Sequence, residues 1–356
     1  MKALKLAVFV LFAAACGKEG TNSSTASSTS SSTGSVDLTG AGATFPYPLY
    51  SKWFDEYAKL TGVKINYQSI GSGGGIRQLS EGTVDFGASD SPMSDAELAK
   101  AKFGPILHIP TVLGAVVITY NIPALSAPLN LTPQAIADIF AGKVTKWNDG
   151  RIAALNPGVS LPNSDILVVH RSDGSGTTYI FTDYLTTAAP SWKAIGKGKE
   201  VSWPAGLGAK GNEGVAGQVK QTPGAIGYVE LAYAKQNKLP IAAVKNKAGK
   251  FVIASVPAVT AAAAGVAKTL PANTDFRISV VDAPGPDAYP ISSFTWILVY
   301  QHQRDSVKGK KLVDFLNWAL TYGEPEAPSL DYAPLPSEMT PKVRAKVATI
   351  DFAGAK

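Results

Sequence analysis

The strongest structural signal in this chain is the stretch ILVVHRSDGSGT, residues 166–177. Its first four residues, 166–169, are branched and apolar, which is typical of a buried strand. Downstream, apolar residues recur at the spacing of one helical face, namely Ile180, Phe181, Tyr184 and Leu185. The polar residues in between, 170–177, are therefore predicted to form a tight loop that joins a strand to the N-terminus of a helix.

This loop has the chemistry of a binding site for a small tetrahedral oxyanion. A helix N-terminus presents backbone N–H groups without intrahelical partners, together with the positive end of the helix dipole. Gly174 and Gly176 allow a ligand to approach the backbone closely, and Arg171 adds a planar cation. Ser175 and Thr177 add hydroxyl donors. An ordinary Ser/Thr helix cap beside a solvated Arg would use the same residues, so the loop alone leaves both interpretations open.

The N-terminus is predicted to be a secretion signal followed by a flexible tether. Residues 1–15 carry two lysines near their start, Lys2 and Lys5, and continue as a short apolar run that ends in three alanines. Cys16, the single cysteine of the chain, follows as in the lipobox of bacterial lipoproteins, although the usual Leu three positions earlier is missing. Lipidation of Cys16 is expected, and plain signal cleavage nearby is the alternative. Residues 16–35 are mostly small and polar, which predicts a tether outside the fold.

The composition of the chain is that of a globular protein with a large core. Its 356 residues are enough for two domains of ordinary size, and 45% of them are hydrophobic. The net charge of +6 is spread along the chain without a Lys/Arg run. This distribution weakly favours an anionic ligand and argues against nucleic acid as a partner.

Strand–loop–helix units recur along the chain, which indicates an α/β fold with a parallel or mixed sheet. In such folds, ligands bind at the carboxyl ends of the strands. The loops at that position are rich in Gly, Ser and Thr, and they contain Thr44, Ser72, Asp90 and Arg171. The helix after the glycine-rich run at 71–75 is predicted to begin near Ile76.

The sequence contains none of the residue constellations that catalysis requires. The three histidines, His108, His170 and His302, are far apart in the chain and not at metal-ligand spacing. Neither a GxxxxGK[ST] phosphate loop nor a GxGxxG fingerprint after a strand occurs. Ser175 lacks the GxSxG spacing of a nucleophile elbow. The protein is therefore not expected to be an enzyme, and neither a cofactor nor a metal is expected.

Four ordered motifs resemble those of the phosphate-binding proteins of bacterial phosphate ABC transporters. They are TGAGATFP at 39–46, GSGG at 71–74, VDFGASD at 84–90 and RSDGSGT at 171–177. The resemblance covers essentially everything after the tether. It implies a type II-like periplasmic-binding-protein fold, with two α/β domains joined by a two-strand hinge and an anion cleft between them. On this resemblance, domain I comprises residues 36–110 and 285–356, and domain II comprises residues 111–284.

The resemblance also implies which residues bind phosphate, namely Thr44, Phe45, Ser72, Asp90, Arg171, Ser175, Gly176 and Thr177. Hydroxyls, backbone N–H groups and the guanidinium would act as donors, with Asp173 placed to orient Arg171 through a carboxylate–guanidinium pair. Asp90 is the exception, because a carboxylate repels an anion unless the anion brings a proton for it to accept. Phosphate carries such a proton near neutral pH, whereas sulfate does not. A surface Asp close to a helix is the alternative interpretation of Asp90.

These expectations describe an extracytoplasmic receptor that captures inorganic phosphate and delivers it to the permease subunits of an ABC importer. The protein is expected to be a monomer, periplasmic or on the cell surface, and held at a membrane by a lipid on Cys16. Two alternatives stay open: a receptor for sulfate, molybdate or a phosphonate, and a phosphatase built on the same cleft. Hinge closure around the ligand is the expected motion.

Overall fold

A computed structural model of the chain describes residues 37–352 except 124, 126 and 272, and these residues belong to one compact unit. The predicted signal segment, Cys16 and the tether lie outside the described residues. A large mixed sheet has the strand order β2-β1-β3-β11-β4-β8-β6-β7, and a small sheet has the order β10-β9-β5. The strands are β1 (Leu38–Gly42), β2 (Ile65–Ser69), β3 (Phe86–Ser89), β4 (Ile106–Tyr120), β5 (Asn130–Leu131), β6 (Leu167–Arg171), β7 (Leu207–Ala209), β8 (Ala225–Glu230), β9 (Ala243–Lys245), β10 (Phe251–Val252) and β11 (Ser292–Tyr300).

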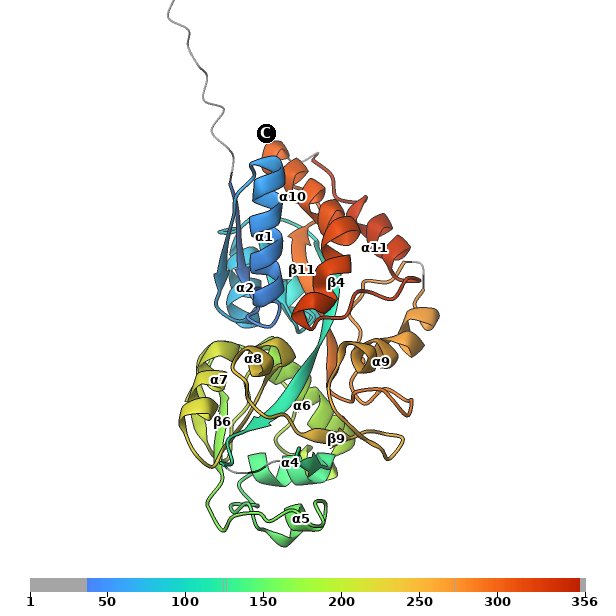
Figure 1. The fold of residues 1–356 in the computed structure, drawn as a ribbon. Helices are drawn as coiled ribbons and strands as arrows, with labels where there is room; N and C mark the ends of the chain where they lie inside the picture. Colours follow the sequence, from blue (N-terminus) through green and yellow to red (C-terminus); the bar gives the residue numbers. More distant parts are fainter. Residues whose placement is uncertain (1–36, 124, 126, 272, 353–356) are drawn as a thin grey trace, which may run out of the picture. The chain divides into compact units, whose positions relative to one another are not determined.

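The long strand β4 connects two parts of the large sheet (Figure 1). Its residues 106–115 pair antiparallel with β11, and its residues 116–120 pair antiparallel with β8. On the β11 side of the sheet, β1 lies between β2 and β3 and is parallel to both. On the β8 side, β6 lies between β8 and β7 and is parallel to both. We call strands β2, β1, β3 and β11, with the loops and helices at their ends, the β1 half. Strands β8, β6 and β7, with theirs, form the β8 half.

Helices follow the strands, as the strand–loop–helix pattern predicts. α1, for example, buries the aromatic side chains of Tyr50, Trp53, Phe54 and Tyr57, which recur at helical spacing. No helix in the described part of the chain is both long and apolar enough to cross a bilayer. The α-helices are α1 (Tyr47–Thr61), α2 (Ser72–Glu81), α3 (Asp95–Leu98), α4 (Pro133–Phe140), α5 (Gly150–Ala153), α6 (Gly176–Ala188), α7 (Gly211–Gln221), α8 (Leu231–Gln236), α9 (Val256–Thr269), α10 (Ser306–Trp318) and α11 (Thr340–Val347).

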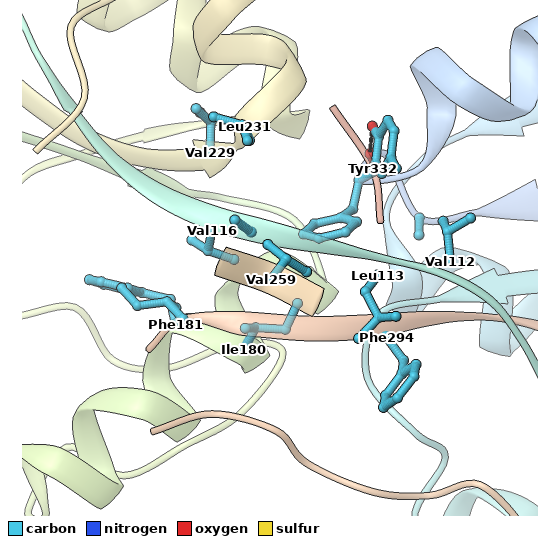
Figure 2. Close-up of a cluster of buried hydrophobic side chains, with 14 of the residues drawn as sticks. Val112, Leu113, Val116, Ile180, Phe181, Val229, Leu231, Val259, Phe294 and Tyr332 are labelled. Atoms are coloured by element: carbon cyan, nitrogen blue, oxygen red, sulfur yellow. Dashed lines mark hydrogen bonds between the residues drawn. The ribbon is translucent and has the colours of Figure 1, made fainter. Parts of the chain in front are cut away.

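Apolar side chains pack around the middle of β4, where the two parts of the sheet join (Figure 2). Val112, Leu113 and Val116 of this strand are fully buried. Phe294 of β11 and Phe181 of α6 belong to the same core cluster. Burial of each such side chain stabilises the fold by roughly 1.5–3 kcal/mol. The core therefore fixes the strands whose carboxyl ends hold the predicted site.

One strand is longer than its apolar pattern predicts. β6 continues through His170 and Arg171, two polar residues predicted to lie in the loop. They pair in parallel with Gly208 and Ala209 of the short strand β7, and the His170 ring also stacks on Trp203 with centroids 4.8 Å apart. Edge pairing and ring stacking therefore keep these residues in the sheet despite their polarity.

One helix begins earlier than predicted. α2 starts at Ser72 rather than near Ile76, so three glycines lie in its first turns. Glycine lowers helix stability, but a Cβ atom on Gly75 would lie only 2.5 Å from the carbonyl oxygen of Ala41. The close contact between α2 and β1 thus requires glycine here, and it overrides the local propensity.

Candidate functional site

The predicted binding residues lie at the carboxyl ends of four strands. Thr44 and Phe45 follow β1, Ser72 follows β2, Asp90 follows β3, Arg171 ends β6, and Ser175, Gly176 and Thr177 surround the start of α6. All eight are buried, and none of the seven that carry a side chain is more than 3% exposed. The structure therefore brings residues from distant parts of the sequence into one interior network.

Loops of the β1 half and the β8 half touch each other at Gly176. A Cβ atom on Gly176 would lie 2.4 Å from Ser72 Oγ and 2.6 Å from Asp90 Oδ2, both in the β1 half. Beside this contact, the Gly73 N–H donates to the Gly174 carbonyl at 2.8 Å. The start of α6 thus lies directly against the loops that follow β2 and β3, and the absence of a side chain at 176 permits this approach.

The Arg171 guanidinium is oriented by a two-point ion pair with Asp173. Nε donates to Asp173 Oδ1 at 2.8 Å and Nη2 donates to Oδ2 at 2.5 Å, while Nη1 donates to Thr177 Oγ1 at 3.2 Å. Burial tends to raise the pKa of Asp173, but hydrogen bonds from Arg171 and the Gly211 N–H hold it below its ordinary value. These contacts use three of the five guanidinium N–H donors, so Arg171 is held in place with donors left for an anion.

Asp90 is a buried carboxyl group among hydroxyls. Thr295 Oγ1 donates to Asp90 Oδ1 at 2.8 Å, and Ser72 Oγ accepts the Asp90 backbone N–H at 3.1 Å while lying 3.5 Å from Oδ2. Burial raises the pKa of Asp90 to about 7, although the Thr295 bond, the Arg171 charge and Ser72 act in the opposite direction. Burial thus favours the protonated form of Asp90, whereas Thr295, Arg171 and Ser72 favour the carboxylate that could accept a hydrogen bond.

The start of α6 supplies backbone donors to the same place. Ser175 is the N-cap of this helix, because its Oγ accepts the Thr178 N–H at 3.0 Å. An oxygen that accepts one bond keeps its own proton to donate. The first N–H groups of the helix, at Gly176 and Thr177, have no intrahelical acceptors, and the helix dipole favours an anion there. Helix capping and anion binding are thus compatible roles for this loop.

Two further residues complete the network, and neither was predicted from the sequence. Asn212, in the first turn of α7, donates from Nδ2 to Thr44 Oγ1 at 2.8 Å and to Thr177 Oγ1 at 3.1 Å. Asn212 also lies just beyond the carboxyl end of a strand, but that strand, β7, has only three residues and a weak pattern. Thr295, the donor to Asp90, lies inside β11 and carries no sequence signal that separates it from other strand residues.

Two buried tyrosines of the β8 half form hydrogen bonds to the backbone of Arg171 and Thr44. Tyr228 Oη accepts the backbone N–H of Arg171 at 3.1 Å, and Tyr233 Oη donates to the Thr44 carbonyl at 2.6 Å. Burial raises the pKa of Tyr228 to about 12, so this phenol remains neutral. Both tyrosines thus fix the backbone at these positions. Other contacts orient the side chains of Arg171 and Thr44.

The site as a whole offers many hydrogen-bond donors and two carboxyl groups, of which Asp173 is occupied by Arg171 and the Gly211 N–H and Asp90 faces the start of α6. The donors are hydroxyls, backbone N–H groups and one guanidinium, and the acceptor is Asp90. Among the residues the structure describes, no three His, Cys, Asp or Glu side chains are grouped as a metal ion would require. The arrangement suits a small oxyanion that is bound by fixed dipoles and one cation.

The chain belongs to the PBP superfamily, whose domain model matches residues 23–321. It is 46% identical to the phosphate-binding protein PstS of Pasteurella multocida over 319 residues, which are 89% of this chain and 91% of the relative. It is 44% identical to PstS of Xylella fastidiosa strain Temecula1 over 329 residues, which are 91% of this chain and 88% of the relative. Within the superfamily, the chain is therefore a member of the family of PstS phosphate-binding proteins, as its four motifs predict.

The fold is also similar to solved structures. A crystal structure of a phosphate-binding protein from Stenotrophomonas maltophilia aligns with a TM-score of 0.69 and 24% identity, covering 90% of this chain and 96% of that chain. This similarity and the superfamily match confirm the predicted α/β periplasmic-binding-protein fold.

Proposed function

We propose that this protein captures inorganic phosphate outside the cytoplasm and delivers it to the permease of an ABC importer. One observation supports this function above the others: a buried set of donors that faces the buried carboxyl group of Asp90. The donors bind the oxygens of a tetrahedral anion. Asp90 accepts a hydrogen bond from the oxygen on which phosphate retains a proton near neutral pH. The relatives are named as phosphate-binding proteins, and their names agree with this chemistry.

The proposed ligand contacts are those implied by the family motifs. Thr44, Ser72, Ser175 and Thr177 donate hydroxyl protons, Phe45 and Gly176 donate backbone N–H groups, and Arg171 donates from its guanidinium. Asp173 does not touch the ligand in this proposal but orients Arg171. The site binds and releases phosphate without chemistry, because it presents no activated nucleophile beside the anion. Binding alone is the function expected of a transport receptor.

We propose two domains, residues 36–110 with 285–356 and residues 111–284, that close on phosphate about a hinge. The change of β4 from pairing with β11 to pairing with β8 supports a first hinge in this strand, and it places the hinge at residues 115–116, five residues beyond the proposed boundary. The contact of Gly176 with Ser72 and Asp90 supports a closed form, because these residues come from opposite halves. Opening would separate the two sets of donors and release the ligand.

The titration that tests the function uses the purified full chain, first with phosphate and then with sulfate. Calorimetry is expected to show one phosphate per chain and no sulfate binding at pH 8. Tight binding of sulfate, or no binding of either anion, would contradict the proposal. A chromogenic phosphate ester added to the same protein is expected to stay intact, and its hydrolysis would favour a phosphatase instead.

Arg171→Lys is expected to weaken phosphate binding by about 10-fold. Lysine keeps the charge, but its single ammonium group cannot form hydrogen bonds with Asp173, Thr177 and the ligand at the same time, as the planar guanidinium can. One lost hydrogen bond is worth ~0.5–1.5 kcal/mol. Calorimetry measures the affinity, and a melting curve shows that the variant is folded. Arg277→Lys is the matched control, because Arg277 pairs with Asp95 and Asp275 at the surface. Unchanged affinity in folded Arg171→Lys would remove Arg171 from the site.

Cys16→Ser is expected to move the protein from the membrane fraction to the soluble fraction. We propose that Cys16 carries the lipid that anchors a monomeric receptor beside its permease, in the periplasm or at the cell surface. The Ser- and Thr-rich residues 17–35 offer little apolar area for membrane binding. Fractionation of expressing cells tests this, with Thr21→Ser as a control in the tether. A variant that fractionates like the wild type would indicate a different anchor.

A further inference from the structure

We propose that Asn212 is a positioning residue that forces the hydroxyls of Thr44 and Thr177 to point their protons at the ligand. The proposal concerns a residue outside the set that the family motifs imply. It rests on the proposed function, because it explains how the same site recognises a phosphate ion. Its basis is the complete hydrogen bonding of one buried amide.

The orientation of the Asn212 amide is determined by the backbone of Glu230. Asn212 Oδ1 accepts the Glu230 N–H at 2.9 Å, and a backbone N–H is always a donor. The amide nitrogen must therefore lie on the opposite side, where it donates to Thr44 Oγ1 at 2.8 Å and to Thr177 Oγ1 at 3.1 Å. Asn212 is fully buried, so water does not compete for these groups. The reversed amide would set two donors against each other and is excluded.

The amide in turn determines what the two hydroxyls do. Thr44 Oγ1 accepts from the Asn212 side chain and from the Asn212 backbone N–H at 3.2 Å. Thr177 Oγ1 accepts from the same side chain and from Arg171 Nη1 at 3.2 Å. A hydroxyl oxygen has two acceptor positions and one proton. Because both acceptor positions are occupied in each hydroxyl, only donation remains for the ligand.

This arrangement also depends on the closeness of the two halves of the sheet. Thr44 belongs to the β1 half, whereas Thr177 and Asn212 belong to the β8 half. The Asn212 amide therefore bonds to Thr44 only when the halves are together. The site becomes a set of pure donors on closure, which leaves Asp90 as the acceptor for a protonated oxygen. Asn212 thus supports both the affinity for phosphate and its selection over fully ionised anions.

The first test is Asn212→Asp with phosphate as the probe over a range of pH. Above neutral pH the new carboxylate accepts hydrogen bonds from both hydroxyls. The ligand therefore loses two donors and faces an added negative charge. We expect the dissociation constant to rise at least about 100-fold over wild type at pH 8.5. As pH falls to 5.5 the carboxyl regains one proton to donate, and the ratio of variant to wild type is expected to shrink to about 10-fold. Because a buried carboxylate also destabilises the fold until it is protonated, a melting curve at each pH must show that the variant is folded.

The second test asks whether Asn212 acts through the two hydroxyls. In a double-mutant cycle, Asn212→Ala is combined with Thr44→Val and Thr177→Val. We expect Asn212→Ala to weaken phosphate binding about 10-fold or more alone, and less than about threefold when both hydroxyls are already absent. Equal costs in the two backgrounds would show that Asn212 acts through the Glu230 backbone or the fold, and would overturn the proposal.

Asn246→Asp is the matched control for the buried amide. Asn246 is 5% exposed, and the two protons of its Nδ2 are shared among three backbone carbonyl oxygens at 3.0–3.1 Å, those of Gly285, Pro286 and Ala288, away from the site network. Its substitution is expected to lower the melting temperature without changing phosphate affinity. Wild-type protein that does not bind phosphate would refute the proposed function itself. Wild-type binding with an unchanged Asn212→Asp variant at pH 8.5 would refute only the role of Asn212.

Discussion

Gly176→Ala is expected to weaken phosphate binding by about 100-fold or more while the protein remains folded. The added methyl carbon would lie 2.4 Å from Ser72 Oγ, 2.6 Å from Asp90 Oδ2 and 2.7 Å from Asp90 Cβ. Non-bonded carbon and oxygen atoms need more than 3 Å, so the loops must separate by roughly 1 Å. A displacement of that size in a site of directed groups costs on the order of 10²-fold.

The fold is expected to be affected less than the affinity, because the loops can move apart to relieve the clash. Gly176 is the first residue of α6, and alanine is the better helix former at a helical position. Gly217→Ala in α7 is the matched control, because no atom lies within 4 Å of the position of its Cβ apart from its chain neighbours and the nearby backbone of its own helix. That variant is expected to bind phosphate normally and to gain up to ~1 kcal/mol of stability. Calorimetry and melting curves on both variants separate a steric effect at the site from a general effect of replacing glycine.

Small-angle scattering then shows whether the methyl group acts by preventing closure. With saturating phosphate, wild type is expected to contract, whereas Gly176→Ala is expected to keep a larger radius of gyration. Wild-type affinity in Gly176→Ala would mean that the contact between α6 and the loops after β2 and β3 is not needed for binding. Contraction without binding would separate closure from ligand recognition.

The positions of the site loops could be predicted because they follow from local signals. Alternating or apolar strands followed by Gly, Ser and Thr indicate the carboxyl ends of parallel strands, and such ends meet at one edge of a sheet. Thr44, Ser72 and Asp90 satisfy this rule, and so does the loop after Arg171. No distance between these loops was needed to place them in one site.

The partners of these residues could not be predicted because they depend on long-range packing. Asn212 bonds to Thr44 across 168 residues, and Thr295 bonds to Asp90 across 205 residues. Neither partner has a local pattern that distinguishes it. The early start of α2 has the same cause, since the contact of Gly75 with the backbone of β1 determines it rather than helix propensity. Local sequence thus indicates where the site lies, and tertiary contacts determine how its groups are oriented.

Asp90→Asn is expected to give the protein measurable affinity for sulfate while much of its phosphate affinity remains. In the proposed site, the wild-type carboxylate accepts a hydrogen bond from a protonated ligand oxygen, and sulfate has no such proton at neutral pH. Sites that demand one hydrogen bond reject ligands without it by ~10⁴–10⁵-fold. In the variant, the Thr295 hydroxyl, which donates to Oδ1 at 2.8 Å, keeps the amide oxygen on its side. The amide nitrogen then replaces Oδ2, which faces Ser72 and Gly176, and it donates to either anion.

The pH dependence of sulfate binding by the wild type tests the same idea independently. Because burial raises the pKa of Asp90 to about 7, the carboxyl is ionised at pH 8.5 and protonated at pH 5.5. The ionised form repels sulfate, whereas the protonated form donates to it, so sulfate affinity is expected to rise as pH falls through 7. The Arg171 charge stabilises the ionised form of Asp90 and so opposes the effect of burial. Asp90→Asn lacks the titrating group, and its sulfate affinity is expected to stay nearly constant over the same range.

Competition of sulfate against labelled phosphate, at one salt concentration and several pH values, measures both effects. Asp183→Asn is the control for a buried carboxylate elsewhere, because Asp183 pairs with Lys197 and Ser279 rather than with the site. Strong sulfate binding by the wild type at pH 8.5 would contradict the assignment of phosphate. An unchanged selectivity ratio in Asp90→Asn would show that other groups discriminate the two anions. Sulfate affinity that rises in acid for the wild type alone would identify the proton on Asp90 as the feature that distinguishes phosphate from sulfate.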